Sequence, residues 1–64
     1  MAQTIKEGHL SVKARTPSGP VQIDGLRVKV EKDGESIIVT ENKGSASEKT
    51  TVLPPGSTVE IKPH

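Results

Sequence analysis

Few side chains in this sequence have the types and the spacing that catalysis requires. A hydrolase triad combines a nucleophile, a base and an orienting group. Serines are plentiful and His9 could act as a base, but no nucleophile-elbow motif accompanies them. The phosphate-binding patterns GxxxxGK and GxGxxG do not occur either. We therefore expect a protein that is not an enzyme and uses no cofactor.

Metal ligands are also sparse. The sequence has no cysteine, His9 precedes an alternating segment, and His64 is the last residue. Both histidines are therefore expected in solvent, and no metal site is predicted. The carboxylates are scattered over turn positions and outward strand positions, where they favour solubility (Asp24, Asp33, Glu31, Glu35, Glu41 and Glu60).

Four basic residues could form a stripe that binds an anionic ligand. Lys13, Arg15, Arg27 and Lys29 would line up if the first strand lies beside the strand at 26–31. Small β-barrels bind the nucleic-acid backbone in this way, but they usually add aromatic side chains on which bases stack. The sequence contains no Phe, Tyr or Trp, so nucleic-acid binding is the second hypothesis.

Composition indicates one small domain that needs a partner. The chain has 64 residues, a net charge of +1, and seven Val, five Ile and three Leu as its large apolar residues. Domains of this size usually add disulfides, a metal or oligomerisation to a thin core. Without cysteine or a metal cluster, the partner is expected to be a second copy or a parent chain. No apolar run is long enough for a membrane span, and the composition leaves the compartment open.

Alternating apolar residues predict short β-strands. Leu10, Val12 and Ala14 share one face of the segment 9–15. The segment TPSGP at 16–20 then interrupts pairing. A phase shift at Asp24-Gly25, between VQI and the apolar set Leu26, Val28 and Val30, indicates a bulge or a tight corner.

The strongest local signal is Asp33-Gly34 between two alternating segments, which predicts a hairpin with a two-residue type I′ turn. That turn would pair Val30 with Ile37, and Val28 with Val39. Ile38 would then point to the opposite face, across from Lys29. Because Ile38 would lie among charged residues there, we predict an interface at Ile38, Arg27 and Lys29.

The last third of the chain is predicted to contain a polar loop at 41–47 and two strands, EKTTVL and STVEIKP. Pro55-Gly56 suits the centre of a type II turn that would make these strands an antiparallel pair. The fold class predicted is all-β: a small antiparallel β-sandwich or partly open barrel of five or six short strands. Residues 1–8 are expected to form a flexible extension and residues 9–64 a single domain.

The order of these elements resembles that of the carboxypeptidase-regulatory-like and collagen-adhesin B-type modules, which are small β-sandwiches. The matching segments are Leu10–Ala14, Val21–Val30, Thr40–Gly44 and Leu53–Ile61. Thr58 stands where those modules usually have a tyrosine, and no lysine faces the predicted core, so the isopeptide bond of some adhesin modules is not expected. The function predicted is a structural or protein-interaction module, such as an oligomer-forming subunit or an accessory domain of a surface or assembly protein.

Overall fold

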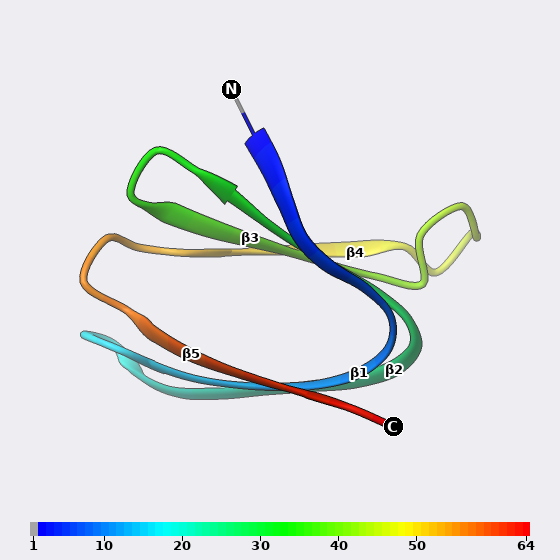
Figure 1. Cartoon of the computed structure of the whole chain (residues 1–64), viewed down its shortest axis with the longest axis horizontal. Coiled ribbons are helices and arrows are strands. Elements are labelled where there is room, and N and C mark those ends of the chain that lie inside the picture. The colour runs from blue at the N-terminus through cyan, green and yellow to red at the C-terminus, as the bar shows by residue number, and fades with distance from the viewer. Residues whose placement is uncertain (1) are drawn as a thin grey trace.

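The computed structural model describes residues 2–64 and is all-β. Five strands form one antiparallel sheet in the order β4-β3-β2-β1-β5. They are β1 (Ala2–Thr16), β2 (Gly19–Asp33), β3 (Ser36–Glu41), β4 (Lys49–Leu53) and β5 (Thr58–Pro63). The sheet curls over itself without closing, so β3 and β4 lie above β5 and the adjoining ends of β1 and β2 (Figure 1).

The two longest strands, β1 and β2, form a hairpin that runs through both layers. Its tip is tight, because Thr16 pairs with Gly19, and the Thr16 hydroxyl donates a 2.8 Å hydrogen bond to the Gly19 carbonyl. The boundary expected at residue 9 falls inside β1. Residues 2–8 pair with the second half of β2 as part of the same strand.

The bend between the layers coincides with a bulge in this hairpin. Gly8 pairs with Val28 and Leu10 pairs with Gly25, so Leu26 and Arg27 lie opposite His9 alone. A bulge kinks a strand and increases its twist, which lets β1 and β2 continue from one layer into the other (Figure 1). The bulge predicted from the phase shift at Gly25 is confirmed.

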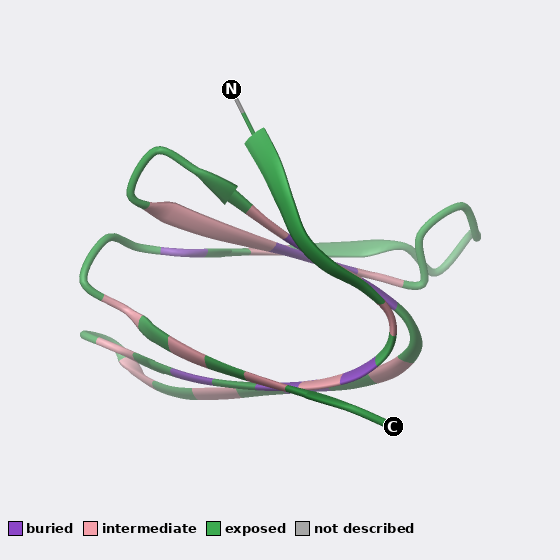
Figure 2. Cartoon of the chain, in the orientation of Figure 1, coloured by how far each residue is buried: buried purple, intermediate pink, exposed green. Residues whose placement is uncertain are grey.

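The core fills the space between the layers. Its buried members come from four strands: Leu10, Val12, Ala14, Ile23, Val28, Val30, Val39 and Leu53. In Figure 2 buried segments alternate with less buried ones along the second half of β1 and along β2, as period-2 strands require, whereas residues 2–7 of β1 are exposed throughout. Leu26 was expected in this set, but it is 73% exposed. The two-residue bulge at Leu26 and Arg27 breaks the alternation just before Val28, so the Leu26 side chain points to solvent.

The hairpin between β2 and β3 is confirmed, but its predicted register is wrong. Asp33 pairs with Ser36 and Val30 with Val39, so the turn residues are Gly34 and Glu35. Gly34 has φ +63° and Glu35 has no positive φ, which is the φ pattern of a type II′ turn. A type I′ turn at Asp33-Gly34 would force Asp33 to positive φ as well. The observed turn is less strained, because only Gly34 has to adopt a positive φ.

The turn between β4 and β5 has the predicted chemistry but a different role. Gly56 has φ +90°, and the Ser57 N–H donates to the Pro54 carbonyl at 3.3 Å, as expected for a type II turn centred on Pro55-Gly56. The predicted pairing of the last two strands is wrong. The turn carries the chain between layers, from β4 at one edge of the sheet to β5 at the other, and β5 pairs with β1.

Candidate functional site

Ile38 and Val52 are direct cross-strand partners on the outer face of β3 and β4. In an antiparallel pair, partners in register have Cβ atoms about 4.5–5.5 Å apart on the same face. Val52 is 60% exposed and Ile38 is half-buried. We call these two residues the outer apolar pair. The expectation that Ile38 faces away from the core is confirmed.

The surroundings of the outer apolar pair differ from the prediction. With the observed register, Ile38 pairs with Glu31 on its β2 side, and Lys29 pairs with Thr40 instead. Lys29 and Glu31 lie side by side along β2, with a 3.9 Å separation between Nζ and Oε2. On its β2 side, Ile38 therefore borders Lys29 and Glu31, whose opposite charges partly cancel. On its β4 side it borders Val52.

The β4 strand ends the sheet beside this pair. Within residues 2–64, β4 pairs with β3 alone, so one side of its backbone has no neighbouring strand. The side chains from Thr50 to Val52 carry no charge. Unpaired backbone N–H and C=O groups on such a strand form a template for another β-strand.

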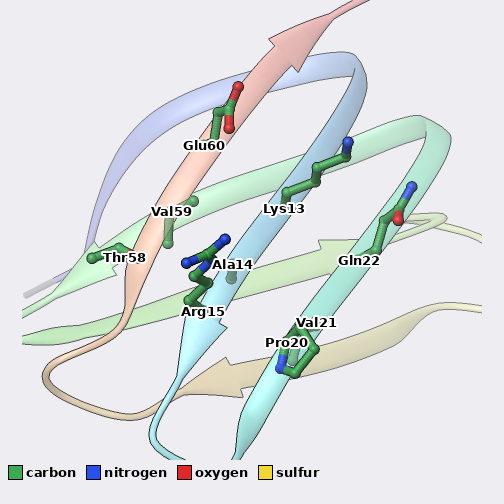
Figure 3. A pocket seen from close by; sticks show the side chains of 9 residues that line it. All are labelled: Lys13, Ala14, Arg15, Pro20, Val21, Gln22, Thr58, Val59 and Glu60. Carbon is green, nitrogen blue, oxygen red and sulfur yellow. The ribbon is translucent and has the colours of Figure 1, made fainter.

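A shallow concave surface lies on the opposite layer, over β5, β1 and β2. It measures about 780 Å³. Figure 3 shows Lys13, Arg15, Gln22 and Glu60 projecting toward the viewer on this side. Lys13 pairs with both Gln22 and Glu60, because β1 is the central strand there. The carboxylate directly across from Lys13 reduces the positive potential of this surface.

The four basic residues predicted to form one stripe are placed in two separate regions. Lys13 and Arg15 lie on the concave surface and pair with Gln22 and Pro20, whereas Lys29 pairs with Glu7, beyond the bulge. Arg27 lies in the bulge itself. The bend of β1 and β2 separates the two groups, so no continuous basic track joins them.

Arg27 and Lys29 instead meet a third cation, Lys43, which sequence reasoning missed. The three border a hollow of about 280 Å³ whose other lining residues are Glu7, Gly8 and Val28. Lys43 belongs to the polar loop after β3, where no periodic pattern signals a side-chain direction. Only the fold of that loop places it beside β2.

The two lysines of this hollow perturb each other. The side-chain interaction between the Lys29 and Lys43 amines lowers the pKa of Lys43 and raises the pKa of Lys29. Like charge on Lys29 lowers the pKa of Lys43 further, while Glu31 and Glu7 act in the opposite direction.

The two histidines lie together near the end of β5. Their rings stack with centroids 4.3 Å apart, and the His64 N–H donates to the His9 carbonyl at 3.0 Å. The His64 Nε2 lies 2.9 Å from the Asp24 Oδ1. Both histidines are exposed. Across residues 2–64, no group of three or more His, Asp or Glu side chains is arranged to hold a metal ion.

Comparison with known proteins does not place the chain in a family. No family model matches it, and neither a curated protein nor a solved structure is significantly similar. The resemblance to carboxypeptidase-regulatory-like and collagen-adhesin modules therefore stays a prediction. In the described residues, no helix is long and apolar enough to cross a membrane.

Proposed function

We propose that this protein is a non-catalytic structural or protein-interaction module that associates with a second copy of itself along β4. The observation that carries the proposal is the outer apolar pair beside an open sheet edge. Val52 lies on β4, is 60% exposed and adjoins Ile38 of β3. Within residues 2–64, the outer side of the β4 backbone pairs with no other strand. An apolar side chain next to free backbone groups suits the addition of another strand.

A second copy fits this edge because β4 can pair with itself. In an antiparallel arrangement about a two-fold axis, one surface patch meets its own copy. With Thr51 at the axis, Val52 of each copy would lie opposite Thr50 of the other. No like charges meet in the centre of such a pair, since Thr50, Thr51 and Val52 are uncharged. The outer apolar pairs of both copies then lie on one continuous face.

The thin core supplies a further reason for association. Among residues 2–64, eight buried hydrophobic residues make up the core cluster, and none of them is aromatic. Burying an exposed valine contributes up to about 1.5–3 kcal/mol. That amount is a large share of the net stability of a small domain.

The first test compares a lysine at each position of the outer apolar pair with a lysine on the opposite edge strand, β5. Val52→Lys and Ile38→Lys should reduce the sedimentation mass of the wild-type oligomer to the 6.8 kDa monomer. Val52→Lys places a charge beside the strand of the second copy, and Ile38→Lys places a charge next to Val52 in the outer apolar pair. Thr58→Lys adds the same charge to an exposed position on β5 and should leave the mass unchanged. A wild-type monomer at high protein concentration, or equal dissociation by Thr58→Lys, would contradict the proposal.

Nucleic-acid backbone binding through Lys13, Arg15, Arg27 and Lys29 is the alternative, with weaker support. The bend divides these four residues, and Glu60 pairs with Lys13. Phosphate contacts make affinity fall steeply with salt. Titration of a mixed-sequence oligonucleotide at two salt concentrations tests the alternative. Salt-sensitive binding that requires both Lys13 and Lys29 would favour it over the interaction module.

A further inference from the structure

The hollow bordered by Arg27, Lys29 and Lys43 has the features of a small anion site. Its volume of about 280 Å³ lies near the lower limit for small-molecule pockets, which suits a single compact group. Gly8 contributes no side chain to its wall, and the space where a Cβ would stand is empty. We call this hollow the three-cation site.

Backbone structure holds the three cations together. The bulge places Arg27 at the bend of β2, and the Asn42 N–H donates to the Arg27 carbonyl at 2.8 Å. This hydrogen bond ties the loop to β2 one residue before Lys43. Asn42 adopts the left-handed region, with φ +53°, which turns the chain back at the end of β3.

Hydrogen bonds within the loop between β3 and β4 stabilise its conformation. The Ser45 N–H and hydroxyl both donate to the Asn42 carbonyl, at 3.1 Å and 2.8 Å. The Gly44 N–H donates to the Glu48 carboxylate at 3.2 Å. A loop constrained in this way keeps the backbone of Lys43 beside β2, and its exposed side chain borders the hollow.

The site brings positive charges together without full compensation. Glu31 lies 3.9 Å from Lys29, and Glu7 pairs with Lys29 across β1 and β2. Glu7 also lines the hollow, and both carboxylates act on Lys43 as well as on Lys29, so two negative charges offset only part of the charge of the three cations. Lys43 lies beside Lys29, another cation, so an anion between them would replace a repulsive contact with two attractive ones.

We propose that the three-cation site binds one phosphate group, either as the free ion or as a small phosphate ester. The Arg27 guanidinium can present paired N–H donors to two phosphate oxygens, and the two lysines can donate charge-assisted hydrogen bonds to the others. This inference goes beyond the association along β4 and does not depend on it. A continuous nucleic-acid strand is disfavoured, because the remaining cations, Lys13 and Arg15, lie beyond the bend.

The test is titration of the full chain with inorganic phosphate, followed by backbone amide NMR, at constant ionic strength set with chloride. Phosphate should shift the amide signals of residues 27, 29 and 43 along saturable curves. Lys43→Gln should weaken phosphate binding about tenfold or more, since a hydrogen bond to a charged group is worth about 1.5–3 kcal/mol. Lys62→Gln removes one positive charge on β5 and serves as the matched control with unchanged affinity.

Thermal unfolding separates loss of the site from loss of the fold. In chloride, Lys43→Gln should unfold at the wild-type temperature or slightly above it, because the variant removes the contact between like charges. Phosphate should then raise the unfolding temperature of the wild type more than that of the variant. A variant with wild-type phosphate affinity, or phosphate shifts spread evenly over the surface, would overturn the proposal.

Two further ligands identify the source of the phosphate group. Tighter binding of O-phosphoserine than of inorganic phosphate would indicate a phosphate ester, and equal affinities would indicate the free ion. The third ligand is a mixed-sequence single-stranded oligonucleotide. If it binds and Lys13→Gln weakens it as much as Lys43→Gln does, the ligand is an extended backbone and the single-phosphate site is wrong.

Discussion

The two edges of the sheet, β4 and β5, are built in opposite ways. β5 presents Glu60, Lys62 and Pro63 along its length, which are the charges and the proline that natural edge strands use against unwanted pairing. β4 has only Lys49, at its start, and then continues through uncharged residues to the buried Leu53. One edge is protected against another strand, and the other is open to it.

The inner faces of these strands differ as well. Leu53 of β4 is 1% exposed and belongs to the core cluster, whereas Val59 and Ile61 of β5 are only partly buried against it. β4 is thus anchored by one deeply buried side chain, and β5 by two shallower ones. A well-anchored strand with an open edge is the better platform for a partner, because its backbone stays ordered before binding.

The largest expected effect distinguishes these two anchors. Leu53→Ala should destabilise the fold by about 2–5 kcal/mol, because the change leaves a cavity in a closed part of the core. Ile61→Ala removes atoms from a half-buried position and should cost clearly less. Urea denaturation of both variants, at one protein concentration, measures the difference. Equal costs would mean that the two edges are anchored alike.

A smaller effect is expected at the turn that aligns the β4 side of the sheet. Gly34 has φ +63°, so Gly34→Val should cost about 1–3 kcal/mol, because a β-branched residue resists that conformation. Glu35 has no positive φ, and Glu35→Val should cost less than Gly34→Val by thermal unfolding. A greater loss in Glu35→Val would show that the turn does not depend on glycine at position 34.

The smallest change in stability should come from converting the β5 edge to resemble β4. Glu60 and Lys62 are exposed, so the double variant Glu60→Thr, Lys62→Thr should shift the unfolding free energy by only about 0.5 kcal/mol. Its effect should appear in association instead, because the edge loses two protecting charges. Light scattering should detect species larger than those of the wild type. No change in size would show that Pro63 and the twist of β5 are sufficient protection.

Turn chemistry could be read from local sequence because each turn depends on one or two residues. Pro55-Gly56 adopts the predicted type II geometry, and Gly34 marks the hairpin tip. The hairpin register was still mispredicted, because Asp33-Gly34 and Gly34-Glu35 both satisfy the need for a turn glycine. The two registers differ in which residues pair, but they keep the same side chains on each face, as a two-residue shift must. The outward direction of Ile38 therefore did not depend on the choice between them.

The candidate sites were less accessible to sequence reasoning than the turns. Ile38 could be singled out because it breaks an alternating pattern, but its partner Val52 could be found only once β3 and β4 were paired. Lys43 had no signal of its own in a polar loop. The proposed phosphate site depends on the bulge at Arg27 and on the hydrogen bond from Asn42, neither of which a periodic pattern specifies.

The sequence by itself determined the β-class, the approximate positions of the strands from residue 9 onward and the facing of most apolar residues, because alternation and turn residues act over a few neighbours. It did not predict that residues 2–8 extend β1. The tertiary structure alone decided that β5 crosses to pair with β1, that the bend divides the basic residues, and that Leu26 lies in solvent. The physical reason is that a sheet edge offers the same backbone hydrogen bonds to any strand. The choice among partners is made by burying one shared core between the layers, and that core exists only when the whole chain has folded.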